Sequence, residues 1–280
     1  MGPTNPQSQQ PDAPKLPIPG VKHIIAVGSG KGGVGKTTVS VNLAISLQKL
    51  GRKVGLLDAD VYGPNIPLMM GIQETPVGNG QNIRPIENYG VRMMSMGFLN
   101  PGDKPLVWRG PMLHSVMQQF LRNVEWGELD YLIIDLPPGT GDVALSLMQT
   151  APLSGAVVVT TPSEVSLEDA RKAVNMFRQV RVPVLGIVEN MSYLIAPNSG
   201  ERIDVFGQGG GKRTASTMQI PYLGELALDP EVRIGGDNGK PVSTRDESDA
   251  HAAPFRALAH EVEKRCKEAQ TAGPKITVED

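Results

Sequence analysis

The sequence predicts an α/β fold, in which helices cover both faces of a mostly parallel central sheet. Its strand candidates are continuous apolar runs, such as residues 131–135, and do not alternate polar with apolar residues. Continuous runs of this kind are typical of parallel strands that are buried on both faces. Helix candidates follow several of these runs, and such helices are the connections that parallel strands need.

The expected elements follow in chain order. Strands are expected at residues 24–27, 53–60, 131–135, 155–160 and 184–190, with a last short strand and a turn within 221–230. Helices are expected at 38–50, 112–121, 163–180 and 252–269. Residues 72–107 alternate apolar pieces with Gly, Asn and Pro, which predicts a β-rich excursion that includes 91–96. One domain is expected over 21–270, with a disordered lead at 1–20 and a flexible tail at 271–280.

The composition argues against several kinds of protein. The 27 basic and 29 acidic residues give a formal net charge of −2, so the basic excess that is usual for nucleic-acid binding is missing. No apolar run reaches the roughly 18 to 20 residues of a membrane span, and no signal pattern opens the chain, which predicts a cytoplasmic protein. The single cysteine, Cys266, allows no internal disulfide, and with 4 scattered histidines it cannot build a zinc or cluster site within one chain.

A glycine-rich loop lies between the first strand and the first helix. Residues 30–37 read G-x-x-x-x-G-K-T, which is the phosphate-binding loop pattern, in the strand–loop–helix context that the pattern requires. Its backbone N–H groups and the helix N-terminus favour bound phosphate. We expect Lys36 to bind the outer phosphates and Thr37 to ligate Mg²⁺. The predicted nucleotide-binding residues of the loop are Gly30, Gly32, Gly33, Val34, Gly35, Lys36, Thr37 and Thr38.

A second lysine, Lys31, directly follows the first glycine of the pattern. One interpretation is a solvated loop charge. The other is a lysine that reaches a nucleotide phosphate across a dimer interface and neutralises transition-state charge, as an arginine finger does.

Acidic and amide side chains end three of the expected strands. Asp58 and Asp60 end the second strand, Asp135 ends the third, and Asn190 ends the fifth. Ligands of open α/β sheets bind at this edge. Asp60 is expected to orient the attacking water, Asp58 to support the Mg²⁺ shell or the lysines, and Asp135 to join the Mg²⁺ shell through water. The alternative is that the acids cap the following turns.

Two further features concern the nucleotide. The loop at 136–142 combines Pro137 and Pro138 with Gly139 and Gly141, and this mixture is typical of a switch that senses the γ-phosphate. The Asn190 amide can both donate and accept, so it can recognise a base, although a turn-forming Asn explains it equally well.

These motifs together resemble the Mrp/ApbC family of P-loop ATPases, which is related to MinD and ParA and carries the deviant Walker A loop with the extra lysine. The resemblance rests on residues 28–38, on 57–60 with Gly63 and Pro64, and on the further matches at 108–111, 135–142, 189–193, 229–230 and 235–237. It covers about residues 21–262 and implies a SIMIBI-type P-loop NTPase fold.

The family resemblance also implies an activity and a cargo. It implies a homodimer with two ATP sites at the interface, Mg²⁺-dependent slow ATP hydrolysis, and adenine bordered by Asn190 and by the backbone near Leu228 and Asp229. It further implies a bridging [4Fe-4S] cluster that is delivered to apo-protein or scaffold clients. This sequence differs from the family at the cluster site. Where the family has C-P-x-C, this chain has Ala196, Pro197, Asn198 and Ser199. These degenerate cluster-site positions offer no thiolate, so we expect the standard cluster site to be lost.

A different class of function fits the same loop. A MinD/ParA-like positioning or scaffold switch would use nucleotide as a gate and would carry no cluster. It would need a membrane-binding tail or a basic DNA patch, and the sequence shows neither clearly, so no membrane or nucleic-acid partner is expected.

Overall fold

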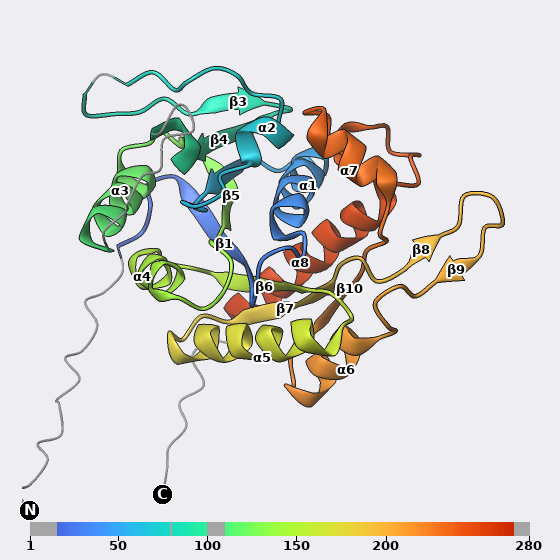
Figure 1. Cartoon of the computed structure of the whole chain (residues 1–280). Helices are drawn as coiled ribbons and strands as arrows, with labels where there is room; N and C mark the ends of the chain where they lie inside the picture. The colour runs from blue at the N-terminus through green and yellow to red at the C-terminus, as the bar shows by residue number, and fades with distance from the viewer. Residues whose placement is uncertain (1–15, 79, 100–109, 272–280) are drawn as a thin grey trace, which may run out of the picture.

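The computed structural model describes residues 16–78, 80–99 and 110–271. A central sheet with the strand order β10-β7-β6-β1-β5-β2-β4-β3 runs through the molecule, with helices on both of its faces (Figure 1). All neighbouring strands in this sheet are parallel except β3, which runs antiparallel to β4 at the edge. The predicted α/β class with a mostly parallel sheet is therefore confirmed.

The strands of the central sheet are short and mostly buried. They are β1 (Val21–Ser29), β2 (Val54–Asp58), β3 (Ile86–Asn88), β4 (Val91–Ser95), β5 (Leu129–Asp135), β6 (Gly155–Thr160), β7 (Val184–Glu189) and β10 (Tyr222–Glu225). A separate antiparallel pair, β8 (Leu194–Ile195) and β9 (Arg202–Ile203), forms a hairpin that projects from the body of the fold (Figure 1).

Helices cover the sheet in two layers. One face carries α3 (Gly110–Arg122), α4 (Asp142–Thr150), α5 (Glu164–Gln179) and α6 (Gly210–Thr217). The other carries α1 (Lys36–Lys49), α2 (Ile66–Met69), α7 (Pro230–Asp237), α8 (Ala253–Thr271) and the 3₁₀ turn η2 (Val242–Thr244); a second turn, η1 (Met96–Leu99), follows β4.

The two cores meet at the central strands. Along β1, Ile24 and Ala26 pack into the core beneath α3, α4 and α5. Ile25 and Val27 pack into the core beneath α1 and α8. Successive side chains of a strand point to opposite faces, so a strand that is covered on both sides is apolar throughout. This burial explains why the sequence has no alternation there.

Several elements differ from the sequence-based expectations. The second strand ends at Asp58 and not at residue 60, so Asp60 lies in the loop that follows. The β-rich excursion contains only the short strands β3 and β4 and the turn η1 among its described residues, while residues 79 and 100–107 lie outside them. Helices α2, α4, α6 and α7 and the β8–β9 hairpin were not predicted.

Strand register brings the functional candidates to one edge. In the ladder, Val27 of β1 pairs with Asp135 of β5, and Asp135 pairs with Asp58 of β2. The glycine loop that follows β1 therefore begins beside both aspartates. No helix among the described residues is both long and apolar enough to cross a lipid bilayer.

The packing of α5 against β1 gives a first test. Phe177 of α5 is fully buried, and a Cβ built on Gly28 would lie 2.9 Å from its ring Cζ. We expect Phe177→Ala to lower the free energy of unfolding by about 3–5 kcal/mol, because it leaves a cavity under the strand that leads into the loop. Urea denaturation measures the effect. Val165→Ala on the same helix removes a side chain that is 68% exposed and should change little; equal losses for both variants would contradict this packing.

Candidate functional site

The glycine loop wraps from the end of β1 to the start of α1. Gly33 and Gly35 have φ angles of 80° and 81°, which side chains other than glycine rarely adopt. A Cβ on Gly30 would lie 2.1 Å from the backbone of Asp169, and one on Gly35 would lie 2.2 Å from Nδ2 of Asn190. No heavy atom lies within 4 Å of a Cβ built on Gly33. Asp169 and Asn190 thus pack closely against the loop at Gly30 and Gly35, while the space beside Gly33 is free of such contacts.

Asp135, at the tip of β5, is the fully buried acceptor beneath this loop. Its Oδ2 accepts hydrogen bonds from Lys36 Nζ at 2.7 Å and from Thr37 Oγ1 at 2.8 Å. Its Oδ1 accepts from Ser40 Oγ at 2.6 Å. All three donors lie on the first turns of α1, so one carboxylate fixes the helix relative to the sheet.

Asp58 is a second buried carboxylate at the same level of the sheet. Its Oδ1 accepts from the backbone N–H of Asp60 at 3.2 Å, and its Oδ2 accepts from Ile66 N–H at 3.2 Å and from Ser95 Oγ at 2.9 Å. Burial, and then the charge of Asp135, raise the pKa of Asp58 to about 7. Asp58 therefore joins both ends of the 60–66 loop. Its support of the Mg²⁺ shell or of the lysines stays a prediction.

Asp60 begins the loop that faces the glycine loop. It is 8% exposed, and its Oδ1 accepts from the N–H groups of Tyr62 at 3.1 Å and Gly63 at 3.2 Å. A pocket of about 240 Å³ opens between the two loops. It is lined by Ser29, Lys31, Gly32, Gly33, Gly35, Lys36, Thr37, Thr38, Asp60, Asn65 and Pro138.

Most of the predicted site residues meet at this pocket. Val34 is the buried residue of the loop itself, and Asp58 and Asp135 lie fully buried below the lining. Lys31 is partly exposed at the rim, where its carbonyl accepts from Ser29 Oγ at 2.9 Å. Of the 136–142 loop, Pro138 lines the pocket, and Gly139 N–H donates to the Ser29 carbonyl at 3.0 Å.

Asn190 braces the glycine loop from the far side. Its Nδ2 donates to the carbonyl of Val34 at 2.8 Å, and its side chain is buried. The preceding residue, Glu189, is fully buried and accepts from Ser192 Oγ at 2.6 Å and from the N–H of Gly211 in the first turn of α6. The tip of β7 thus contacts both the glycine loop and α6.

The degenerate cluster positions lie apart from this pocket, in the turn of the β8–β9 hairpin. Ala196 N–H donates to the Glu201 carbonyl at 2.9 Å, and Ser199 Oγ accepts from Glu201 N–H at 3.3 Å. The hairpin is fixed by Arg202, which bonds Glu225 at 2.8 and 3.2 Å and stacks 4.1 Å above the ring of Tyr193.

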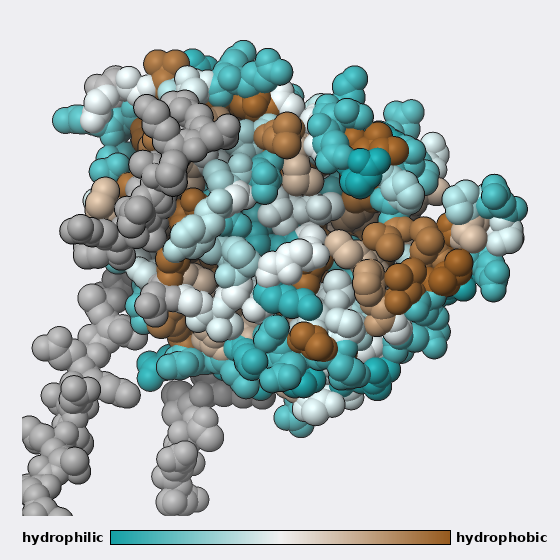
Figure 2. Space-filling view, viewed as in Figure 1, coloured by the Kyte–Doolittle hydropathy of each residue, from teal (hydrophilic) through white to brown (hydrophobic). Residues whose placement is uncertain are grey.

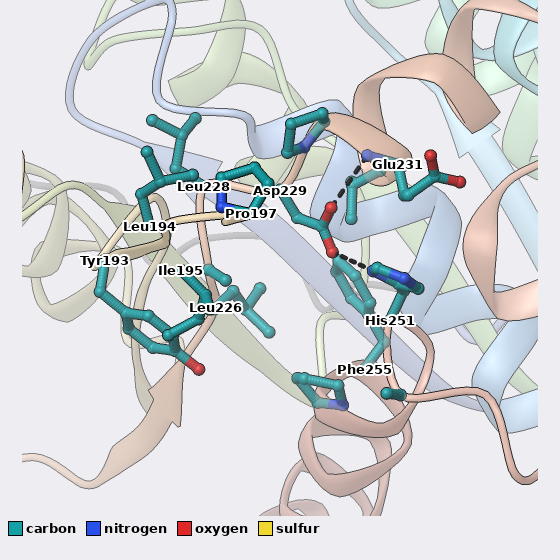
Figure 3. Close-up of a pocket in the computed structure, with 15 residues that line it drawn as sticks. Tyr193, Leu194, Ile195, Pro197, Leu226, Leu228, Asp229, Glu231, His251 and Phe255 are labelled. Atoms are coloured by element: carbon teal, nitrogen blue, oxygen red, sulfur yellow. Dashed lines mark hydrogen bonds and ion pairs between the residues drawn. The ribbon is translucent and has the colours of Figure 1, made fainter. Parts of the chain in front are cut away.

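Apolar side chains gather at the base of this hairpin (Figure 2). Figure 2 shows the patch, to which the exposed residues Ile195, Ile203, Val205 and Phe206 contribute. Beside the hairpin lies a larger, mostly apolar pocket of about 560 Å³ (Figure 3), where His251 Nδ1 lies 2.5 Å from Asp229 Oδ2. Leu228 and Asp229, which we expected near adenine, line this pocket, and its described lining includes no residue of the glycine loop.

Sequence reasoning missed the residues that hold the predicted ones. Ser40, Ser95 and Glu189 are buried partners of the site and were not singled out. Ser40 had a partial signal. It lies four residues after Lys36, and this spacing places both on one face because the helix begins at Lys36, two residues before the predicted start. Ser95 and Glu189 act through contacts across the sheet, which no local pattern marks.

A parallel sheet, a phosphate-type loop that ends in Lys36 and Thr37, and an acidic strand tip beneath them define the chain as a P-loop NTPase. The ParA family, described as NUBPL iron-transfer P-loop NTPase, matches residues 20–263, and the chain belongs to this family. Sequence relatives agree. The chain is 55% identical over 244 residues to the iron-sulfur cluster carrier protein of Deinococcus radiodurans, covering 86% of this chain and 69% of that protein. It is 46% identical over 260 residues to the iron-sulfur cluster transfer protein NUBPL of Dictyostelium discoideum, covering 92% and 80%.

Solved structures give the same family of folds. A nucleotide-binding protein from Archaeoglobus fulgidus in complex with ADP superimposes with a TM-score of 0.72 and 40% identity, over 83% of this chain and 91% of that one. The cell division ATPase MinD of Pyrococcus furiosus superimposes with a TM-score of 0.65 and 26% identity, over 86% and 98%. The predicted relationship to the iron–sulfur carriers, MinD and ParA is confirmed.

The raised pKa of Asp58 gives a test with a defined sign. Its pKa is about 7 in the folded protein, against an ordinary value of 3.8, so the folded state holds this proton more tightly. As pH rises from 3.8 to about 7, the unfolded chain loses the proton first, and stability falls. We expect the free energy of unfolding of wild type, relative to Asp58→Asn, to decrease through this window in urea denaturation at several pH values.

Asp130 provides the control of opposite sign. A hydrogen bond from Lys22 lowers the pKa of Asp130, so its contribution is present above the unfolded pKa and lost as pH falls. The wild-type advantage over Asp130→Asn should therefore shrink toward acid pH. A pH-independent difference between wild type and Asp58→Asn would refute the assignment.

Proposed function

We propose that this chain is a Mg²⁺-dependent ATPase of low turnover that works as a homodimer in the transfer of iron–sulfur clusters to client proteins. The observation that carries the proposal is the buried group of Lys36, Thr37 and Asp135 beneath the glycine loop, with Asp60 across the pocket. The relatives that are named cluster carriers and the ADP-bound neighbour support it.

The residues present fit ATP and Mg²⁺. The open side of Gly33 leaves room for a phosphate against backbone N–H groups. Lys36 supplies a buried positive charge, and Thr37 and Asp135 supply the hydroxyl and carboxylate oxygens that Mg²⁺ prefers. When bound, Mg²⁺ neutralises charge on the β- and γ-phosphates. Thr37 would ligate the ion directly, and Asp135 would hold it through water.

Hydrolysis needs a positioned water and neutralised phosphate charge. Asp60 lines the pocket opposite the glycine loop, and two backbone N–H groups fix one of its oxygens, so the other is available to orient a water. Lys31 lies at the rim, so the partner subunit's Lys31 is the group that would reach the γ-phosphate in the dimer. Lys36 would leave Asp135 for the phosphates as ATP enters.

The nucleotide base has two flanking groups. Asn190 is buried behind the glycine loop and uses its amide nitrogen to hold Val34. Its amide oxygen Oδ1 is not used in that bond, so this oxygen is the atom that would border adenine. The backbone of Leu228 and Asp229 would border the other side of the adenine. A hydrogen bond from Leu228 N–H to the Tyr193 carbonyl, at 2.6 Å, holds this backbone in place.

The cargo site is the part that departs from the family resemblance. Ala196 has no ligand atom, and the Ser199 hydroxyl is a poor substitute for thiolate on iron. Cys266 is buried in α8, and burial raises the pKa of its thiol to about 11, which disfavours the thiolate that would bind iron. We therefore propose that the chain keeps the nucleotide machinery and has lost the standard bridging cluster site.

Removing the carboxylate of Asp60 tests the hydrolytic role. We expect Asp60→Ala to bind ATP as wild type does and to lose turnover by at least about 100-fold, the lower range for a group that handles a proton or positions water. Phosphate release and ATP binding are measured on the same protein. Lys36→Ala should lose both, whereas Asp246→Ala, at an exposed site, should lose neither. Undiminished turnover in Asp60→Ala would remove this residue from the mechanism.

Anaerobic reconstitution with iron and sulfide tests the loss of the cluster site. We expect wild type to retain far fewer than about four irons per dimer, because the thiolates that such a cluster usually takes are missing. Cys266→Ala should leave this low value unchanged. The double variant Ala196→Cys, Ser199→Cys should raise it toward four, since the hairpin is intact. A stable wild-type cluster near four irons would overturn the proposal.

A further inference from the structure

Ser40 is a buried hydroxyl in α1 that the proposed mechanism does not yet use. Its side chain is fully buried, one helical turn after Lys36. A serine inside a helix often bonds the carbonyl four residues back, and here the Lys36 carbonyl lies 3.1 Å from Ser40 Oγ. The Asp135 carboxylate is closer, at 2.6 Å from Oδ1. The hydroxyl has one proton, and a short bond to a charged acceptor is the stronger use of it.

The two oxygens of Asp135 consequently have different surroundings. Oδ2 faces Lys36 Nζ and Thr37 Oγ1, which belong to the nucleotide pocket. Oδ1 faces away from those groups and is held by Ser40. The terminal torsion of an aspartate side chain is broad and roughly two-fold, so its own preference does not fix which way the carboxylate plane turns. Hydrogen bonds on both oxygens do.

The relative importance of these bonds changes when nucleotide binds. In the proposed function, Lys36 would move to the phosphates and Thr37 would hold the ion through a lone pair of its hydroxyl, so the surroundings of Oδ2 would change. Ser40 has no such second task, because it is buried below the pocket lining. Its bond to Oδ1 can therefore persist while the surroundings of Oδ2 change.

We propose that Ser40 is a positioning residue, which orients Asp135 so that Oδ2 meets the Mg²⁺ shell of the bound nucleotide. The inference rests on the proposed function, since it concerns the same ion. Outer partners of metal-binding groups commonly change metal affinity by 10- to 100-fold when they are removed. Ser40→Ala should therefore weaken the affinity of the nucleotide site for Mg²⁺ and leave the glycine loop able to bind phosphate.

The helix itself offers a matched control. Ser46 is also fully buried in α1, but its Oγ donates to Ser243 Oγ at 3.1 Å, away from the pocket. Ser46→Ala removes the same atoms from the same helix and should affect folding without affecting the ion. Ser40→Thr keeps the hydroxyl and serves as the rescue variant.

The experiment measures ATP binding by calorimetry during a Mg²⁺ titration and again in excess EDTA. For Ser40→Ala we expect the half-saturating Mg²⁺ concentration to rise by about tenfold or more. The affinity for ATP in excess EDTA should stay unchanged. Ser46→Ala and Ser40→Thr should match wild type in both, and thermal unfolding of all four proteins identifies any general loss of structure.

Two outcomes would overturn the inference. One is an unchanged Mg²⁺ half-saturation in Ser40→Ala. The other is an equal loss of affinity with Mg²⁺ and with EDTA, which indicates a damaged loop and not a turned carboxylate. If wild type binds no ATP under either condition, the proposed function itself fails and the inference falls with it. If wild type binds ATP and Ser40→Ala has the same Mg²⁺ half-saturation as wild type, the inference alone is rejected.

Discussion

The carboxylate of Asp135 is the constraint on which the rest of the site depends. A fully buried charge is costly unless it is paired and hydrogen-bonded, and Asp135 satisfies this with Lys36, Thr37 and Ser40. Because those donors all belong to the first turns of α1, the interaction sets the height and rotation of the helix above the sheet. Because β1 and α1 fix both ends of the glycine loop, few backbone conformations can connect them.

The same arrangement recurs along the edge of the sheet. Asp58 at the tip of β2 accepts backbone N–H groups from both ends of the 60–66 loop. Glu189 at the tip of β7 accepts the N–H of Gly211 at the start of α6, and its neighbour Asn190 holds the glycine loop. Each of these buried strand tips ends in an acceptor or amide that takes up backbone groups of a loop, which would otherwise be buried without partners. The loops of the site are thereby attached to rigid strands.

The fold class, the glycine loop and the family could be predicted because their signals are local. A doubly covered strand is apolar throughout, and the loop pattern is contiguous in the sequence. Helix α6 could not be predicted from the sequence, because Gly210, Gly211 and its Thr and Ser residues are poor helix formers. Its first turn depends on Glu189 from another part of the chain. Ser95 is beyond local patterns for the same reason: its partner Asp58 is 37 residues away.

The nucleotide pocket and the hairpin have different lining residues, and a single hydroxyl links their supports. Arg202, Glu225 and Tyr193 fix the hairpin without help from Ala196 or Ser199, whose backbone turn is closed through Glu201. Thiolates at those two positions are therefore not needed to fold the hairpin. The link back to the nucleotide is short, since Ser192 bonds both Glu189 and Glu225 within a few residues of Asn190. The absence of thiolates at residues 196 and 199, which the proposed function interprets as loss of the cluster site, is therefore compatible with an ordered nucleotide pocket and an ordered hairpin.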